Sequence, residues 1–202
     1  MSPSRRAVCI GAAAVLTLAA TSVPLVFGIQ EDAALAAYRS GRYDEAIKAL
    51  QEKIGSNQDF PHDHRHLFRA LFEVGRYMEA EQVARGFIEE YPESPDLHNS
   101  LGEVLWTKGH LDEAETAFQE ASNRRAGDWL TAELNLGIAA FDRGRRTEAM
   151  QRFDRFIDFY NNGEATTSRD LTAVGIACQY LGISDSALYQ DALKAFDAAV
   201  AA

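Results

Sequence analysis

Apolar residues recur at steps of three and four over most of this 202-residue chain. One run in the middle of the sequence places four of them on a single stripe: Leu97, Leu101, Val104 and Leu105. A second stripe follows Gly109 and comprises Leu111, Ala114, Ala117, Phe118 and Ala121. This spacing indicates amphipathic helices, and glycine accepts the positive φ that a tight turn between helices requires. The pattern therefore predicts two helices joined by a short turn.

The same order of helix, glycine and helix recurs along the chain at a nearly fixed interval. Four segments share one signature, and they read GRYDEA (41–46), GRYMEA (75–80), GHLDEA (109–114) and GRRTEA (144–149). Their leading glycines are spaced by 34, 34 and 35 residues: Gly41, Gly75, Gly109 and Gly144. A period of this size is typical of a solenoid, in which helical hairpins stack on their neighbours. The sequence therefore predicts a solenoid rather than a globule with one core.

Within the signature, the Glu-Ala pair is identical in all four copies. The alanines are expected where the two helices of a hairpin cross closely, since a larger side chain would push them apart: Ala46, Ala80, Ala114 and Ala149. We interpret the glutamate beside each alanine as a solvated charge at a helix start rather than a catalytic acid. Asp44 and Asp112 also follow the turn, where an acid can cap the second helix or favour its positive N-terminal end.

The repeats resemble the tetratricopeptide repeat family, whose pattern is Trp-x2-Leu-Gly-x2-Tyr, then Ala-x3-Phe, then Pro, over 34 residues. The third and fourth copies carry two of these parts: Leu101-Gly102 with Ala114-x3-Phe118, and Leu136-Gly137 with Ala149-x3-Phe153. The second copy has Leu67, Ala80 and Pro92, and in the first copy Ala33-Ala34 replace Leu-Gly and Leu50 replaces the Phe. The family's tryptophan is absent, and its column holds His64, His98 and Glu133.

The resemblance implies an all-α fold, a right-handed superhelical solenoid of about five stacked antiparallel helix hairpins. The expected repeats within residues 29–202 lie near 29–60, 61–94, 95–128 and 130–163, followed by an irregular copy over 167–202. In that last copy Val174-Gly175 replaces Leu-Gly, and Ala192-x3-Phe196 is retained. Gly182 is expected to be its turn glycine.

The last predicted helix carries apolar residues where a terminal repeat needs a polar outer face. They are Leu193, Phe196, Ala199 and Val200. One interpretation is that the chain is the N-terminal part of a longer repeat protein, or that another subunit covers this end. The alternative is a natural terminus with a small exposed apolar edge.

Residues 1–28 differ in kind from the repeats. Arg5 and Arg6 precede an uncharged stretch from Ala7 to Gln30, whose apolar centre runs from Val8 to Ala20. A basic start followed by an apolar segment is typical of a secretory signal, and the uncharged run also reaches the roughly 20 residues that span a bilayer. We therefore predict either a signal peptide or an N-terminal membrane anchor. In both cases the repeats are exported, to the periplasm or the outer face of the membrane.

Without residues 1–28 the chain keeps 18 basic and 30 acidic residues, a net charge of −12. Such a chain repels nucleic acid and anionic lipid. We therefore expect no nucleic-acid partner, and membrane contact only through residues 1–28 if they are not cleaved. Cys178, the only cysteine outside that segment, lies on an apolar stripe and is interpreted as a small core residue.

An aromatic residue stands three positions before each turn glycine. These four residues, Tyr38, Phe72, Trp106 and Phe141, are called the aromatic ladder below. The family resemblance implies that their column faces the inner, concave surface of the superhelix, where aromatic side chains anchor a peptide or a partner helix. The alternative is that they pack between neighbouring hairpins.

Basic residues of the second copy are expected on the same inner wall. Arg65, His66 and Arg69 occupy columns that face the groove in the family, and Asn99 and Glu103 are counterparts one repeat later. An arginine pair can receive a carboxylate, or it can form ion pairs within the chain, for example between Arg69 and Glu103 or Glu73. The carboxylate clamp that some family members use is not expected, because Glu31, Leu35 and Ser100 occupy its columns.

Other chemistry finds little support in the sequence. His62 and His66 have a spacing that can chelate an ion on one helix face, but Arg65 opposes a cation and the expected site is not a metal site. We find no nucleophile elbow and no glycine-rich phosphate loop. The chain is therefore predicted to be no enzyme and to need no cofactor. The predicted function is that of an exported scaffold that binds a protein or peptide partner in its groove. The alternatives are a structural subunit of a cell-envelope complex, packing through its C-terminal edge, and an accessory repeat domain of a larger protein.

Overall fold

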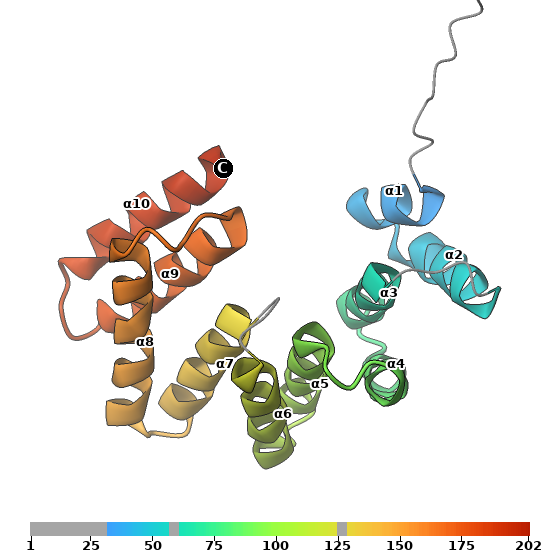
Figure 1. Ribbon diagram of the computed structural model, residues 1–202, viewed down its shortest axis with the longest axis horizontal. Coiled ribbons are helices and arrows are strands. Elements are labelled where there is room, and N and C mark those ends of the chain that lie inside the picture. Colours follow the sequence, from blue (N-terminus) through green and yellow to red (C-terminus); the bar gives the residue numbers. More distant parts are fainter. Residues whose placement is uncertain (1–31, 57–60, 125–128) are drawn as a thin grey trace, which may run out of the picture. The chain divides into compact units, whose positions relative to one another are not determined.

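The computed structural model describes residues 32–56, 61–124 and 129–202. Within these ranges the chain forms ten α-helices and no β-strand (Figure 1). The helices are α1 (Ala33–Arg39), α2 (Tyr43–Gly55), α3 (Pro61–Glu73), α4 (Tyr77–Glu90), α5 (Pro95–Thr107), α6 (Leu111–Asn123), α7 (Trp129–Asp142), α8 (Arg146–Asn161), α9 (Ser168–Leu181) and α10 (Leu188–Ala201). The predicted all-α solenoid of stacked hairpins is confirmed. The predicted signal or anchor over residues 1–28 lies outside the described residues.

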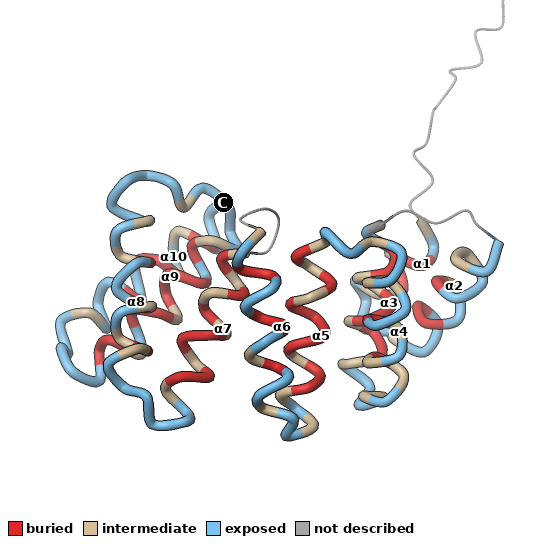
Figure 2. The backbone as a smooth tube through the Cα atoms, turned by 60° about the horizontal axis from the view of Figure 1, so that its bottom comes forward, coloured by how far each residue is buried: buried red, intermediate tan, exposed pale blue. Residues whose placement is uncertain are grey.

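The ten helices form two layers. Each odd-numbered helix contacts the next odd-numbered helix, from α1 through α9. Among the helices described, no even-numbered helix contacts another even-numbered one. The odd-numbered helices therefore form a continuous inner layer, and the even-numbered helices form an outer layer with wider spacing (Figure 1). Buried residues follow the faces between the layers (Figure 2). Each of the described helices is too short or too polar to cross a lipid bilayer.

The four signature glycines end the inner helices of the first four hairpins. Their φ angles are 73° at Gly41, 77° at Gly75, 82° at Gly109 and 78° at Gly144. The Gly41 N–H donates to the Tyr38 carbonyl at 3.0 Å, and the next N–H donates to the Ala37 carbonyl at 3.0 Å. These are the two bonds of a Schellman motif, which satisfies the last carbonyls of a helix. The predicted positive φ at all four glycines is confirmed.

The prediction for the last hairpin is wrong in one respect. Gly182 has a φ of −57° and simply caps α9 in a right-handed conformation. The fifth glycine with positive φ is Gly163, at 73°, which ends α8 with the same pair of hydrogen bonds. The turn between α9 and α10 instead closes through the N–H groups of Ser184 and Asp185, which both donate to the Leu181 carbonyl. A turn of this kind needs no left-handed residue.

The invariant glutamates make local contacts at the starts of the outer helices, three of them ion pairs with arginine and one a contact with a histidine. Each pairs with the residue that precedes its helix: Arg42–Glu45 at 2.7 Å, Arg76–Glu79 at 2.5 Å, His110–Glu113 at 3.4 Å and Arg145–Glu148 at 3.4 Å. Asp44 and Asp112 lie within the first turn, and neither is the N-cap residue. Of the two alternatives for these aspartates, capping is therefore wrong and a favourable charge at the helix start holds. Asp112 also pairs with Arg143 at 2.6 Å.

Glycine and phenylalanine face each other inside three of the hairpins. A Cβ atom at Gly102 would lie 2.4 Å from the Phe118 ring, one at Gly137 2.6 Å from Phe153, and one at Gly175 2.5 Å from Phe196. The glycines of the Leu-Gly pairs thus make room for the rings of Ala-x3-Phe. The irregular last hairpin keeps this contact.

The first two hairpins fill the same two positions with other residues. The first has Ala34 on the inner helix and Leu50 on the outer one, both buried. In the second the sizes are exchanged, because Phe68 lies on the inner helix and Ala84 on the outer one, both 0% exposed. Close packing requires that the summed volume at this contact is kept. The large side chain can therefore come from either helix.

Buried apolar residues form two clusters that meet at α7. The first cluster runs from α1 to α7 and includes Leu136. The second includes Leu130 and Leu134 of α7 and continues to α10. The signature alanines are all 0% exposed: Ala46, Ala80, Ala114 and Ala149. Cys178 is a buried free cysteine, and burial raises the pKa of its thiol.

The outer face of α10 is less apolar than predicted. Leu193 and Val200 are exposed, at 56% and 90%. Phe196 instead packs against Gly175, and Ala199 is buried. Polar side chains separate the two exposed apolar residues along the helix, and they are Lys194 and Asp197.

Candidate functional site

The nine residues of the candidate site all lie on the inner layer. Tyr38 belongs to α1; Arg65, His66, Arg69 and Phe72 belong to α3; Asn99, Glu103 and Trp106 belong to α5; and Phe141 belongs to α7. Asn99 is buried, and the other eight are partly exposed. Seven of them line two neighbouring pockets, which the Arg69–Glu103 ion pair connects, whereas Asn99 and Phe141 line neither pocket.

The rings of the aromatic ladder are half-buried and pack within their own or an adjacent hairpin. Tyr38 contacts the Tyr43 and His66 rings, at centroid distances of 5.8 and 5.2 Å. Phe141 lies 5.0 Å from the Tyr180 ring, and the Arg146 guanidinium lies 3.6 Å from its centroid. Packing between hairpins, one of the two alternatives, is therefore present; each ring also keeps part of its surface open, and its role as an anchor for a partner stays a prediction.

An apolar pocket of about 230 Å³ lies where α3, α5 and α7 meet. Its lining comprises Phe72, Glu103, Trp106, Thr107, Phe118, Asn135 and Ile138. Two rings of the aromatic ladder, Phe72 and Trp106, therefore share one cavity. Ile138 was not among the expected site residues, although it occupies the same repeat position as Arg69 and Glu103.

A chain of polar side chains fixes this pocket to its neighbours. Arg69 pairs with Glu103 at 2.6 Å, and Asn99 donates to the same carboxylate at 2.9 Å. Asn135 in turn donates to the Asn99 side-chain oxygen at 3.0 Å. This chain links α3, α5 and α7 across the inner layer. Ion pairing within the protein, one of the two alternatives for Arg69, is therefore present.

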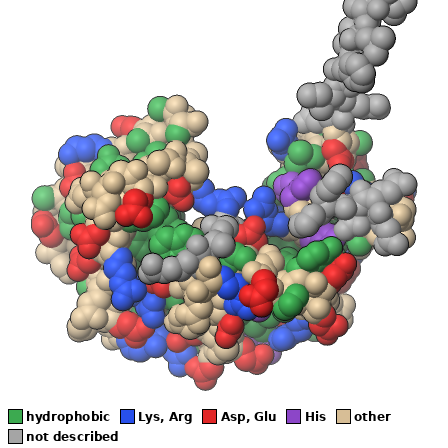
Figure 3. Space-filling model, viewed as in Figure 1, with side chains coloured by type: hydrophobic (Ala, Val, Ile, Leu, Met, Phe, Trp, Pro, Cys, Tyr) green, Lys and Arg blue, Asp and Glu red, His purple; other side chains and the backbone are tan. Residues whose placement is uncertain are grey.

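A basic pocket of about 320 Å³ lies beside the apolar one. Its lining comprises Tyr38, Arg65, His66, Arg69, Thr131 and Arg169. Lys and Arg side chains gather on both sides of the hollow that the inner layer encloses (Figure 3). Thr131 and Arg169 come from α7 and α9, so no argument based on a single repeat position could have found them.

Two of the three arginines of the basic pocket are held by acids outside it. Arg65 pairs with Asp96 at 3.1 Å, and Arg69 pairs with Glu103; their side chains remain 30% and 31% exposed. Burial raises the pKa of the Tyr38 phenol, which therefore stays a neutral hydrogen-bond donor. Burial, with a smaller effect of the Arg65 charge, lowers the pKa of His66. His66 is therefore neutral at pH 7.

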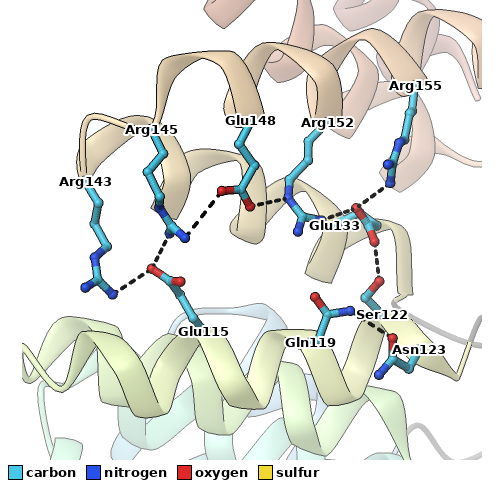
Figure 4. Close-up of polar contacts among 10 residues, drawn as sticks. All are labelled: Glu115, Gln119, Ser122, Asn123, Glu133, Arg143, Arg145, Glu148, Arg152 and Arg155. Atoms are coloured by element: carbon cyan, nitrogen blue, oxygen red, sulfur yellow. Dashed lines mark hydrogen bonds and ion pairs between the residues drawn. The ribbon is translucent and has the colours of Figure 1, made fainter.

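A separate network of ion pairs joins the outer helices α6 and α8 to each other and to the inner helix α7 (Figure 4). Glu115 accepts hydrogen bonds from Arg143 at 2.9 Å and from Arg145 at 2.6 Å. Arg152 bridges Glu148 at 3.2 Å and Glu133 at 2.9 Å. Every carboxylate in this network is paired with an arginine. The network therefore joins neighbouring hairpins.

The three histidines near the start of α3 have different surroundings. The His62 and His66 rings are 5.8 Å apart, whereas His64 is buried and stacks on Phe87 at 3.5 Å. In the part of the chain that the structure describes, no group of three or more residues is arranged to hold a metal ion. His64 therefore serves as a core residue between α3 and α4.

Comparison with family models identifies the repeats. A tetratricopeptide repeat model matches residues 11–64 and 65–128, and a second such model matches residues 131–162. The chain belongs to the tetratricopeptide repeat family. The fold of this tetratricopeptide repeat protein supports a scaffold for protein–protein interaction in general, and scaffolds of the family are generally non-catalytic.

Solved structures share the fold of this tetratricopeptide repeat protein. A crystal structure of MamA has a TM-score of 0.57 at 19% identity, over 85% of this chain and 95% of that one. The structure of MamA from residue 41 to the end, from Desulfovibrio magneticus, has a TM-score of 0.57 at 15% identity and covers 64% of this chain and 72% of its own. TTC0263, a thermophilic tetratricopeptide repeat protein in Thermus thermophilus, has a TM-score of 0.57 at 16% identity, and the match covers 84% of this chain and 96% of that one. No curated protein matches the sequence.

Proposed function

We propose that this protein is an exported scaffold that holds a segment of a partner protein against its inner layer. The observation that carries the proposal is the apolar pocket that Phe72 and Trp106 both line. Large aromatic side chains in partly enclosed pockets contribute most of the binding energy in many protein interfaces. A pocket of about 230 Å³ is suited to one apolar side chain of a bound segment.

The polar chain of Arg69, Glu103, Asn99 and Asn135 supports the same role. It fixes side chains on three inner helices before any partner arrives. A surface that is ordered in advance loses less side-chain entropy on binding. The inner layer therefore offers a partner segment a rigid wall with an apolar hole and polar groups around it.

Binding at the inner layer is tested by affinity capture from a cell-envelope extract with the tagged full chain. Trp106→Ala should weaken retention of the partner by about 2 kcal/mol or more, as loss of a buried aromatic anchor does. Trp106→Leu, which keeps apolar volume, should weaken it less. The matched control is Glu113→Ala, on the exposed start of α6, where the glutamate side chain is 60% exposed. Equal retention by all four chains, each with a normal helical melt, would place the function on another surface.

Export is the second part of the proposal, and the sequence of residues 1–28 motivates it. A reporter fused to residues 1–30 should leave the cytoplasm, and replacing Leu16 and Leu18 by Asp should stop this, because charge abolishes the apolar segment of a signal. Carbonate extraction of membranes then separates a cleaved signal from an anchor. A reporter that stays in the cytoplasm with the unaltered sequence contradicts export.

A second candidate function rests on the exposed apolar residues of α10. Leu193 and Val200 are 56% and 90% exposed, and they would suit a structural subunit that packs through its C-terminal edge. In that case the double variant Leu193→Glu, Val200→Glu should lose association in sedimentation experiments, whereas Trp106→Ala should not. The reverse result favours the scaffold.

A further inference from the structure

We propose that the basic pocket recognises an acidic segment of the protein partner, one that carries two or more Asp or Glu side chains close together. This inference rests on the proposed scaffold function and names the chemistry of its partner. Three arginines, a histidine, a tyrosine and a threonine line the pocket, and none of these six residues is acidic. The arginines, the phenol and the hydroxyl all have N–H or O–H groups to donate, so the ligand must supply acceptors.

The pocket is unusual for the protein that contains it. The chain has a formal net charge of −10, yet Arg65, Arg69 and Arg169 line one cavity. Arg65 and Arg69 pair with acids that lie outside the lining, so the cavity presents guanidinium groups and no carboxylate to a ligand. The three arginines therefore favour a negatively charged ligand in this pocket.

Two of the arginines are already oriented for a ligand. Asp96 holds Arg65 and Glu103 holds Arg69, and neither acid lines the basic pocket. A guanidinium has five N–H donors in a fixed planar fork, so pairing with one carboxylate leaves donors for another. Both side chains keep about 30% of their surface exposed. The acids thus act as supports that position the arginines rather than as competitors inside the pocket.

The size and surroundings of the pocket select a short acidic peptide segment over a nucleic acid. At about 320 Å³ it lies at the small end of the range of ligand pockets. A nucleic-acid strand would extend beyond it over an acidic protein surface, and that surface repels a polyanion. Carboxylates of a short peptide concentrate their charge where the arginines are.

The position of the pocket relates it to the rest of the proposed site. Arg69 lines the basic pocket, and its partner Glu103 lines the apolar pocket. An acidic segment bound at the arginines would therefore continue past Trp106. Because the lining also includes Thr131 of α7 and Arg169 of α9, the ligand would touch hairpins that are distant in sequence.

Fluorescence anisotropy of the purified full chain tests the inference, with a labelled peptide of sequence Glu-Leu-Glu-Glu-Leu-Gly as the probe. The matched peptide has Gln in place of each Glu. We expect the acidic peptide to bind and the Gln peptide to bind at least tenfold more weakly. Arg169→Gln should weaken binding of the acidic peptide by about tenfold, which is the effect of losing one hydrogen bond between charged groups. The control Arg155→Gln removes an outer-layer arginine that is 67% exposed, and it should bind as the unaltered chain does.

Several outcomes would overturn the inference. They are equal binding of the Glu and Gln peptides, unchanged binding by Arg169→Gln, or tighter binding of a phosphoserine peptide or of a short DNA strand. Arg169→Gln must show a normal helical melt, and Arg65→Gln provides a second variant on a different helix. In the envelope capture experiment, retention that depends on Trp106 but not on Arg169 contradicts the acidic ligand and keeps the scaffold. Retention that depends on neither contradicts both.

Discussion

Adding a single methyl group at Gly102 tests whether this glycine makes room for the Phe118 ring. In Gly102→Ala the new Cβ would lie 2.4 Å from two atoms of the Phe118 ring and 3.0 Å from a third. Carbon atoms in contact normally lie about 3.5–4.0 Å apart. Since Phe118 is only 3% exposed, its ring cannot turn out into solvent. The ring or a helix must therefore move by about 1 Å, the difference between these distances.

Two opposing effects decide the size of the change. Alanine is the better helix former, and inside a helix it is favoured over glycine by about 1 kcal/mol. Overpacking of a buried site costs about 1–3 kcal/mol. Because the new Cβ would lie only 2.4 Å from the ring, we expect the cost in the upper part of this range, about 2–3 kcal/mol, and hence a net loss of about 1–2 kcal/mol in the free energy of unfolding. The measurement is urea denaturation monitored by far-ultraviolet circular dichroism. A lower urea midpoint in the variant, with the same dependence of the unfolding free energy on urea as in the unaltered chain, reports the loss of stability.

The control and the rescue come from the same protein. Gly86 lies within α4 and is exposed, and a Cβ there would meet nothing within 4 Å. Gly86→Ala should therefore stabilise the protein by about 0.5–1 kcal/mol. Phe118→Leu alone should destabilise by leaving a cavity, but combined with Gly102→Ala it recreates the pair that Ala34 and Leu50 form in the first hairpin.

The double-mutant cycle should therefore show a favourable coupling of about 1 kcal/mol or more between Gly102→Ala and Phe118→Leu. If Gly102→Ala is as stable as the unaltered chain, or if the two changes are additive, the argument that glycine makes room for the ring is wrong.

Three further predictions concern the core and its titrating groups. Ala114→Leu should destabilise by about 1–3 kcal/mol through overpacking at the helix crossing, whereas Glu113→Gln should change the urea midpoint little. A hydrogen bond from Lys108 of the next hairpin lowers the pKa of Glu81, so the Glu81 carboxylate stabilises the fold above the ordinary glutamate pKa and loses this effect as the pH falls through the lower folded value. The stability difference between the unaltered chain and Glu81→Gln should therefore shrink from about pH 4.5 downward. A difference that stays constant with pH refutes the assignment. In a Cys9→Ser chain, Cys178 should react slowly with a thiol reagent at neutral pH and rapidly in urea, because burial raises its pKa; fast labelling of the folded protein contradicts the core position.

The fold could be predicted because it depends on local, repeated signals. A glycine that must adopt a positive φ leaves a mark in the sequence, and Gly41 and Gly109 recur at the period of the hairpins. Gly182 misled for the same reason: it stands seven residues after Gly175, as Gly109 stands seven after Gly102, but a right-handed cap needs no glycine. The residue that does need one, Gly163, belongs to the link between repeats, where no signature repeats.

The candidate site was harder to predict from the sequence, because it depends on how the hairpins are rotated against each other. The sequence allowed Arg69 either to receive a ligand or to pair with Glu103, and only the distance of 2.6 Å shows that the pair forms. Arg169 and Thr131 approach Tyr38 across the hollow of the inner layer. No spacing along the chain encodes a contact between such distant helices.

The two core clusters that meet at α7 have a consequence for how the protein opens. Leu136 packs into the N-terminal cluster, whereas Leu130 and Leu134 pack into the C-terminal one. Cooperative unfolding units follow continuous buried contacts, so α7 is a boundary that both units share. We expect hydrogen exchange to detect two separately opening parts, α1–α6 and α8–α10. The helix between them should be protected until the more stable part opens, so that α7 acts as a hinge whose loss separates the halves of the repeat array.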